Sequence, residues 1–325
     1  MINSDSLNFF FKNFRPRNIV VPTIEQLNQD PLLEQGEIHL KLSESLFIVR
    51  KNETHSFDSI RMNWFIDFLI KSLSTYPVKN LNCELILNLS DGCGNYDFSK
   101  LCFSQKRGYK NILIPDPHNI NTFVKIQQLS KIDIPFEDKK DLAIFIGSAT
   151  GQPIENDLNL RELSAINNTE SRTSKIKIIP VSGYAEKDML EKKLKAKNLN
   201  FDIFSDYVSI EEQLKYKIIF TADGHTTSWE RPLWIMASNS LCLNIKPHNI
   251  FESWYSDLFS FYQAIPDIDL YSIDLFIENS NIFKEGWSSV KQKQKTLANS
   301  VSSLHNQMLY MSNVIKYYNE QFNLR

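Results

Sequence analysis

Residues 215–246 read KYKIIFTADGHTTSWERPLWIMASNSLCLNIK, and this stretch decides the fold class. A short apolar run leads into a polar loop rich in Gly, Thr and Ser. A helix-like segment and a second apolar run follow. Short apolar runs bounded by turn residues are typical of buried strands. The order of strand, loop, helix and strand therefore predicts a βα unit of a parallel sheet.

The same alternation extends outward from this stretch in both directions. In the second half, further strands are expected at 141–151, 175–181 and 201–204, with a helix at 186–198. In the first half, a helix is expected at 61–76, with strands at 84–90 and 110–116. From about Ser288, apolar residues recur at steps of three, four and seven, which predicts one long amphipathic helix or two in series. The fold class is therefore α/β.

The chain has 325 residues, which is too long for one ordinary core and fits two α/β domains of about 150 residues each. The polar stretch 131–140 is the best boundary between them. We expect a Rossmann-like domain at 1–138, a second Rossmann-like domain at 139–287, and a C-terminal helical segment at 288–325.

Composition excludes several classes of function. Lys and Arg number 36 against 38 Asp and Glu, so the net charge of -2 creates no field that would gather nucleic acid. An anionic ligand must therefore be held locally. The four cysteines form no Cys-x-x-Cys pair and have no His partners at zinc spacing, so we expect neither a metal nor a disulfide framework.

The sequence shows no secretory leader, and no apolar run approaches the roughly 20 residues that a membrane span needs. We therefore expect a cytoplasmic protein. An aromatic cluster near the N-terminus is expected to form a helix packed on the body of the protein. The alternative is peripheral contact with a membrane. The cluster and its basic neighbours are Phe9, Phe10, Phe11, Phe14, Lys12, Arg15 and Arg17.

The loop of the opening stretch carries groups that suit a diphosphate. Thr226, Thr227 and Ser228 are expected to cap the following helix, and Pro232 suits its first turn. Free backbone N–H groups would then face the loop, and Arg231 adds a planar cation that can hold two phosphate oxygens at once. The alternative interpretation is an ordinary helix cap with a surface arginine.

The chain resembles glycosyltransferase family 90, which includes the Rumi-type protein O-glucosyltransferases, fungal capsule-associated proteins and bacterial LpsA-like lipopolysaccharide glycosyltransferases. Residues 215–246, followed by FESWYSDLFSFYQAIPDIDLYSIDLFIE at 251–278, are similar to the strand, loop and strand of that family and the run after them. Upstream, FIGSATG with Arg161 beyond it resembles another family segment, in which an arginine usually occupies the place of Ile146. The resemblance covers most of residues 141–285.

This resemblance implies an inverting, metal-independent transferase of the GT-B type, with two Rossmann-like domains and no cofactor besides its UDP-sugar donor. The domain at 1–138 would hold the acceptor, and the domain at 139–287 the nucleotide sugar. Carried over by position, the donor-binding residues are Gly147, Ser148, Asp223, Thr227, Ser228, Arg231 and Lys246. The implied acceptor is a glycan or lipid-linked oligosaccharide of lipopolysaccharide or capsule biosynthesis.

Inversion by a single displacement needs a base opposite the departing UDP. Asp91 is the expected base, because it follows the apolar run at 84–90 and sits at the carboxyl end of a predicted strand. The family's catalytic Asp occupies a similar strand-end position. The alternative is an Asp that only caps an Asp-Gly turn, and Asp116 is the next choice of base.

Four further residues have weaker claims to the site. His118 and His225 stand in predicted strand-end loops, where a lone His is more often a satisfied polar residue than a catalyst. Trp229 and Trp254 could stack on a sugar or uracil ring, but buried aromatics usually serve the core.

Two other functions were weighed against the transferase. A catalytically silent nucleotide- or glycan-binding protein of the same fold is favoured slightly by Ile146. A sulfo- or phosphoryl-transferase lacks support, because the sequence has no Gly-x-x-x-x-Gly-Lys-Ser/Thr loop.

Overall fold

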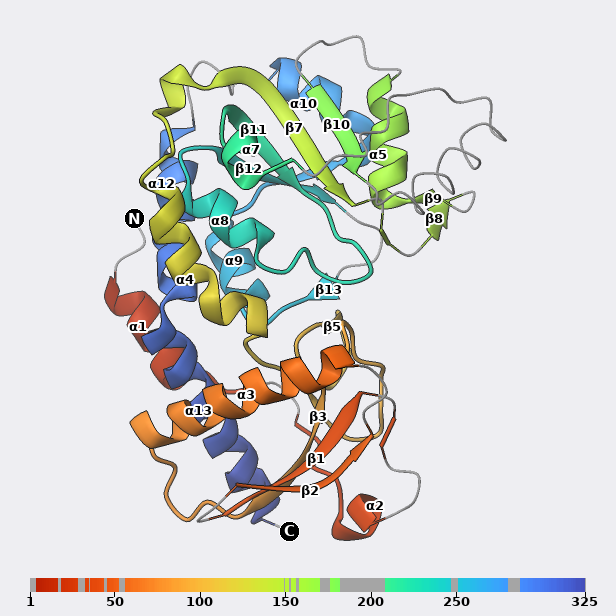
Figure 1. The fold of residues 1–325 in the computed structure, drawn as a ribbon, viewed down its shortest axis with the longest axis vertical. Coiled ribbons are helices and arrows are strands. Elements are labelled where there is room, and N and C mark those ends of the chain that lie inside the picture. The colour runs from red at the N-terminus through yellow and green to blue at the C-terminus, as the bar shows by residue number, and fades with distance from the viewer. Residues whose placement is uncertain are drawn as a thin grey trace. The chain divides into compact units, whose positions relative to one another are not determined.

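The computed structural model is shown in Figure 1. It describes residues 4–16, 19–28, 33–34, 36–43, 46–52, 56–148, 150–151, 153–155, 158–169, 176–181, 208–246, 251–279 and 287–324. The chain divides into two compact units. Unit 1 comprises Met1–Phe123, Ile250–Asp257 and Ser300–Arg325, and unit 2 comprises Val124–Asn249 and Leu258–Asn299.

Unit 1 is built on a mixed five-stranded sheet. In spatial order its strands are β2 (Leu46–Asn52), β1 (Glu37–Leu42), β3 (Cys83–Asn88), β4 (Leu101–Cys102) and β6 (Ile112–Leu113). Strand β1 is antiparallel to both of its neighbours, whereas β3, β4 and β6 run parallel. A short antiparallel pair joins β5 (Gln105–Lys106) to β13 (Phe251–Glu252).

Unit 1 also contains helices. They include α1 (Ser4–Asn13), α2 (Ile24–Asn28), α3 (Ser56–Thr75) and α13 (Leu304–Phe322). Helix α13 packs against α1, α3 and β3. It is tied to the sheet by the hydroxyl of Tyr318, which donates to the Glu84 carbonyl at 3.0 Å.

Unit 2 is built on a five-stranded sheet in which every pairing is parallel. In spatial order its strands are β10 (Ile176–Val181), β7 (Lys140–Ser148), β11 (Tyr216–Thr221), β12 (Leu241–Lys246) and β14 (Asp267–Asp269). Phe145 and Phe220 belong to one buried cluster, and their neighbours Ile144 and Ile219 are also buried. Because both faces of a central parallel strand are covered, the sequence there is a continuous apolar run.

Helices and short elements surround this second sheet. The helices are α5 (Leu160–Thr169), α7 (Ile210–Gln213), α8 (Arg231–Ala237) and α10 (Ile273–Asn279), with the 3-10 turns η1 (Phe136–Asp138) and η2 (Leu270–Ser272). Strands β8 (Pro153–Glu155) and β9 (Leu158–Asn159) form a small antiparallel pair. Helices α4 (Pro117–Leu129), α9 (Ser256–Tyr262) and α12 (Ser288–Ser302) run across the divisions between the units.

The α/β class and the parallel sheets are as the sequence predicts, and the two C-terminal helices α12 and α13 lie in series. The predicted helix at 186–198 and strand at 201–204 lie outside the described residues. The expectation of a Rossmann-like first half needs correction, because the β1–β2 hairpin makes its sheet mixed. The expected domain boundaries stay a prediction, and the compact units divide within α4, between Phe123 and Val124.

Phe9, Phe10, Phe11 and Lys12 of the N-terminal cluster lie in α1, Phe14 and Arg15 follow it, and Arg17 lies outside the described residues. Phe11 is fully buried and its ring centroid lies 6.1 Å from that of Trp254, whereas Phe9 is 69% exposed. None of the helices in the described residues is both long and apolar enough to cross a membrane.

Candidate functional site

The order in which the chain adds strands to the sheet of unit 2 reverses between β7 and β11. After β7 the chain continues to β10 on one side of it, and then returns to β11 on the other side. The carboxyl ends of two strands that diverge in this way form a crevice, which is where open α/β sheets bind ligands. The regular pairing of β7 with β11 extends to Ile144 and Ile219, so the carbonyls beyond this point need other partners.

Arg231 supplies one set of these partners from the first position of α8. Its Nη1 donates to the Ile146 carbonyl at 3.0 Å, and its Nε donates to the Phe220 carbonyl at 3.2 Å. Its Nη2 donates to Oε1 of Gln213 at 3.2 Å. Arg231 therefore bridges the ends of β7 and β11. A guanidinium has five N–H donors, so two of them make no hydrogen bond to another described residue.

Arg161 makes a second bridge one step further along the same two chain segments. Its Nη1 donates to the Ser148 carbonyl at 2.8 Å and to Oγ1 of Thr150 at 3.0 Å. Its Nη2 and Nε donate to the Ala222 carbonyl at 2.9 and 3.3 Å. The two arginines thus bridge the ends of these segments in successive layers.

The two guanidinium groups create a concentrated positive charge. Their central carbons lie 5.4 and 5.0 Å from the ring centroid of Phe145. Burial lowers the pKa of Arg161 to about 10, and the nearby Asp223 carboxylate partly opposes this shift. Burial and then the charge of Arg161 lower the pKa of Arg231 to about 9. Within the residues described, Arg231 has no carboxylate partner.

The loop after β11 fits closely around Arg161. A Cβ atom on Gly224 would lie 3.0 Å from Nη2 of Arg161 and 3.0 Å from Oγ1 of Thr150, so a larger residue here would have to displace these side chains slightly. The facing Gly151 has φ +152°. Thr226 is buried, and its hydroxyl has no hydrogen-bond partner among the described residues. A buried hydroxyl without a partner costs free energy unless a ligand or water completes it.

The expected capping of α8 by the loop is wrong. The N-cap residue is Glu230, which makes no side-chain capping bond. The hydroxyl of Ser228 instead donates to the Ala222 carbonyl at 2.5 Å, because that strand-end carbonyl is buried. The proline expected in the first turn is confirmed as Pro232. With only seven residues, α8 adds little helix dipole to the site.

The remaining donor-binding residues lie at the same edge of the sheet. Gly147 and Ser148 end β7, and a Cβ on Gly147 would lie 3.0 Å from the Phe145 ring. Thr227 and Asp223 are half-buried in the loop, and Lys246 is exposed at the end of β12. Their roles in donor binding stay predictions.

The predicted base, Asp91, belongs to unit 1 and follows the end of β3. Its side chain is 48% exposed, and Oδ1 accepts a hydrogen bond from Nη2 of Arg61 at 2.5 Å. Arg61 also donates to the Leu89 carbonyl at 2.7 Å, so one arginine fixes both the strand end and the carboxylate. Asp116 is buried, and its Oδ1 accepts from the backbone N–H of His118 at 2.8 Å at the start of α4. That capping role makes Asp116 a poor base.

The four weaker residues divide between core and surface. Trp254 is 2% exposed, donates to Oδ1 of Asn119 at 3.2 Å and serves the core of unit 1. His225 is exposed. His118 is half-buried, and Trp229 is half-buried with φ +51°, a backbone conformation that L residues rarely adopt.

Arg161 lies beside the predicted donor-binding residues but was not among them. Its only signal in the sequence was its place after FIGSATG. The spacing of residues along the chain does not reveal its hydrogen bond to the Ala222 carbonyl. No group of three or more His, Cys, Asp or Glu that could hold a metal ion is found among the residues that the structure describes.

No protein-family model matches the chain, and no curated protein matches it. Among solved structures, the N-terminal domain of trehalose-6-phosphate phosphatase from Candida albicans is similar, with a TM-score of 0.32 and 11% sequence identity. The alignment covers 68% of this chain and 48%, about half, of that one. A likeness at this level supports no conclusion about activity. The resemblance to glycosyltransferase family 90 therefore stays a prediction.

Proposed function

We propose that the chain is an inverting glycosyltransferase of the GT-B type that uses a UDP-sugar as donor. The observation that carries the proposal is the pair of bridging arginines at the switch point of the parallel sheet in unit 2. Arg161 and Arg231 bring two positive charges to the ends of β7 and β11, and Asp223 is the nearby carboxylate that partly compensates the charge of Arg161. An anion bound there would relieve the repulsion between the two arginines.

A diphosphate suits this charge better than a neutral ligand does. The two remaining N–H donors of Arg231 and the hydroxyl of Thr226 are groups that phosphate oxygens can complete. The same cations would stabilise the charge that develops on the departing UDP, so the transfer needs no metal ion. In this proposal Gly147, Ser148 and Thr227 line the diphosphate, and Lys246 lies near the donor.

Asp91 is proposed as the base that takes the proton from the acceptor hydroxyl. Its exposure makes the carboxylate accessible, and the bond to Arg61 holds it in one orientation. The proposed acceptor is a glycan or lipid-linked oligosaccharide of bacterial lipopolysaccharide or capsule biosynthesis, at the cytoplasmic face of the membrane. The alternative remains a silent nucleotide- or glycan-binding protein. The two arginines by themselves do not distinguish a transferase from a silent binding protein. They also bridge strand-end carbonyls, which either protein would need.

Calorimetry with UDP and with uridine, which lacks the diphosphate, tests the donor site. We expect UDP to bind at least tenfold more tightly than uridine, since charge-assisted hydrogen bonds are each worth about 1.5–3 kcal/mol. In Arg231→Gln this preference should largely disappear. If UDP, GDP and CMP all fail to bind the wild-type chain, the proposal is wrong.

A donor screen with mass-spectrometric detection then separates transferase from silent binder. Transfer should continue in EDTA, because the proposed leaving-group stabilisation uses arginine and hydroxyl groups. Loss of transfer in EDTA, restored by manganese or magnesium, would reveal a metal requirement. Nucleotide binding without transfer to any glycan tested would favour the silent alternative.

A further inference from the structure

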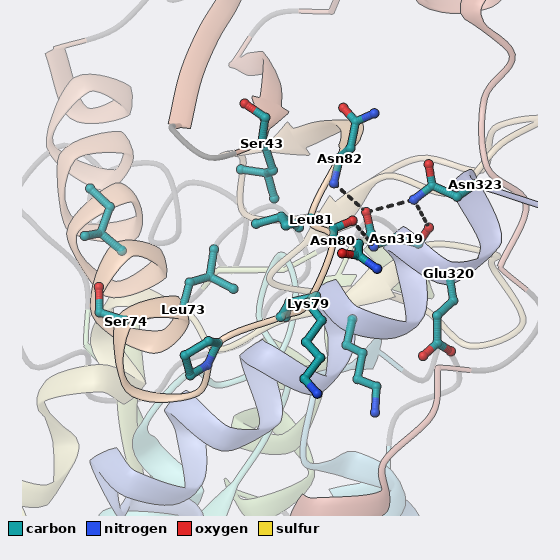
Figure 2. Close-up of a pocket in the computed structure, with 15 residues that line it drawn as sticks. Ser43, Leu73, Ser74, Lys79, Asn80, Leu81, Asn82, Asn319, Glu320 and Asn323 are labelled. Carbon is teal, nitrogen blue, oxygen red and sulfur yellow. Dashed lines mark hydrogen bonds between the residues drawn. The ribbon is translucent and has the colours of Figure 1, made fainter.

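Unit 1 contains a pocket of about 1360 Å³ at the carboxyl end of α3, far along the chain from every residue of the donor site. Four segments line it: the end of β1, the last turn of α3, the loop at 77–82 and the last turns of α13. Figure 2 shows these residues around the opening. Pockets for drug-sized ligands measure about 300–1,000 Å³, so this one suits a ligand longer than a single sugar ring.

The pocket is preformed by a buried amide. Asn319 on α13 is 5% exposed, and its Oδ1 accepts from the backbone N–H of Asn82 at 2.8 Å. Its Nδ2 donates to the carbonyl of Asn80 at 3.2 Å, and Asn323 donates to Asn319 Oδ1 at 3.1 Å. These bonds, dashed in Figure 2, hold the loop at 77–82 against α13. A loop already in place costs a ligand little ordering entropy.

The wall of the pocket offers hydrogen-bonding groups beside aliphatic ones. The side-chain amides of Asn80 and Asn82 are exposed and make no hydrogen bond within the described part of the chain. An amide both donates and accepts, which matches a sugar hydroxyl. The aliphatic side chains can pack against the C–H face of a sugar ring. They are Leu42, Ile70, Leu73, Pro77, Val78 and Leu81.

The charge of the pocket favours an anion. Lys79 and Lys316 are both exposed at its wall, and neither forms an ion pair with another described residue. Glu320 is the single acidic residue among the described residues that line the pocket. The excess of positive charge selects a ligand that carries a carboxylate or phosphate group.

We propose that this pocket binds a short acidic oligosaccharide, at a site separate from the donor-binding edge of unit 2. The acyl chain of an anionic lipid fits less well, because it would remove water from Asn80 and Asn82 without replacing their hydrogen bonds. The proposal does not depend on sugar transfer, since a silent glycan-binding protein would need such a site as well.

Titration of the whole chain with tetragalacturonate, followed by calorimetry, tests the site directly. Tetragalacturonate should bind more tightly than neutral maltotetraose, and its affinity should fall with added salt. The double variant that combines Lys79→Gln and Lys316→Gln should bind tetragalacturonate at least roughly tenfold more weakly. This is the order expected for lost charge-assisted hydrogen bonds. The matched control is Lys71→Gln with Lys110→Gln, which removes the same charge from exposed positions of unit 1 outside the pocket.

Two further measurements separate a ligand contact from general charge. Asn80 has φ +52°, so Asn80→Gly removes the side-chain amide while the backbone keeps its conformation. This variant should bind both tetragalacturonate and maltotetraose more weakly. Bound tetragalacturonate should also protect Lys79 and Lys316, but not Lys71, from acetylation by an N-hydroxysuccinimide ester.

Several results overturn the proposal. The first is that tetragalacturonate does not bind at about 1 mM. The second is that the pocket double variant and the control double variant lose affinity for tetragalacturonate equally. The third is that the chain binds phosphatidylglycerol vesicles and not tetragalacturonate. Because none of these measurements involves UDP, failure here leaves the donor proposal standing. Failure of UDP binding likewise leaves the oligosaccharide site standing.

Discussion

At the scale of single residues, Arg161 and Arg231 combine a structural task with a proposed binding task. Each bridges carbonyls of β7 and of the segment that ends β11, at the point where regular strand pairing stops. A cation in such a place stabilises the strand ends through its hydrogen bonds but raises the electrostatic free energy of its surroundings. Variants therefore have to be measured for stability and for nucleotide binding separately.

Arg161→Gln should lower both the stability of the chain and its affinity for UDP. The exposed Ser148 carbonyl would lose its bond from Arg161, and the carbonyl of the buried Ala222 would keep only the Ser228 hydroxyl as a donor, so the free energy of unfolding should fall by about 0.5–1.5 kcal/mol in urea titrations. UDP affinity by calorimetry should fall roughly tenfold. Arg107→Gln is the matched control, because that side chain is 53% exposed and pairs with Glu252 on the surface. Reduced stability with unchanged UDP affinity would mean that Arg161 holds the strand ends together and takes no part in nucleotide binding.

His39 makes unit 1 sensitive to acid. Its Nε2 lies 3.0 Å from Oε2 of Glu84, and its Nδ1 is buried with no partner in the described residues. Burial lowers the pKa of His39 below the usual 6.5, although Glu84 opposes this shift. Between the folded pKa and 6.5 the unfolded chain binds more protons, so stability is full above 6.5 and is lost as the pH falls through that window.

The free energy of unfolding should therefore decrease between about pH 7.5 and pH 5, and His39→Gln should flatten this dependence. Urea titrations across that pH range measure it. The exposed His225→Gln should keep the wild-type profile. A profile that His39→Gln leaves unchanged would assign the acid sensitivity to other groups.

At the scale of elements, α12 completes a strand that has too few neighbours. Pairing of β12 with β14 begins at Asn244, so the backbone of Cys242 faces α12 instead. Gln294 is fully buried; its Oε1 accepts from the Cys242 N–H at 3.0 Å, and its Nε2 donates to the Cys242 carbonyl at 2.7 Å. Nε2 also donates to the Ala264 carbonyl at 3.0 Å. One side chain thus takes the place of a paired strand.

Gln294→Ala should lower the free energy of unfolding by at least about 2 kcal/mol, because it leaves buried backbone groups of Cys242 and Ala264 without partners. Gln292→Ala, on the exposed side of the same helix, should change it by less than about 0.5 kcal/mol. Equal effects in urea titrations would mean that the lost helix side chain, rather than the bonds to β12, sets the stability.

At the scale of the whole molecule, the proposed base and the proposed donor-binding residues belong to different units. Asp91 belongs to unit 1, whereas Arg161, Arg231 and Lys246 belong to unit 2. A base acts in the transition state and adds little to donor binding. The two units should therefore respond differently when each is altered: changes in unit 2 affect UDP affinity, and a change at Asp91 affects turnover.

Asp91→Asn should lower the rate of transfer by about 100- to 10,000-fold and leave UDP affinity within about twofold. Steady-state transfer assays and calorimetry measure the two effects. Asp97→Asn makes the same change of charge at an exposed position nearby and should have little effect on either. A near-normal rate in Asp91→Asn would place the base elsewhere.

The sequence by itself determined the elements whose signal is local. The apolar runs that became β3, β7, β11 and β12 were recognisable because each of these strands lies between two others and is mostly buried. The helical periodicity after Ser288 was recognisable because α12 and α13 each bury one face. The order of strand, loop and helix at 215–246 also predicted that Arg231 and the loop before it follow a strand of a parallel sheet, as they do in unit 2.

Only the tertiary structure decided which groups meet. The bond from Arg231 to the Ile146 carbonyl spans 85 residues, and the bond from Asn319 to Asn82 spans 237. The β1–β2 hairpin and the true start of α8 at Arg231 likewise depend on neighbours that no local pattern names. Strand and helix periodicity follow from each residue's own burial. Hydrogen bonds to unpaired carbonyls instead depend on where distant strands stop pairing, and the packed chain alone sets that.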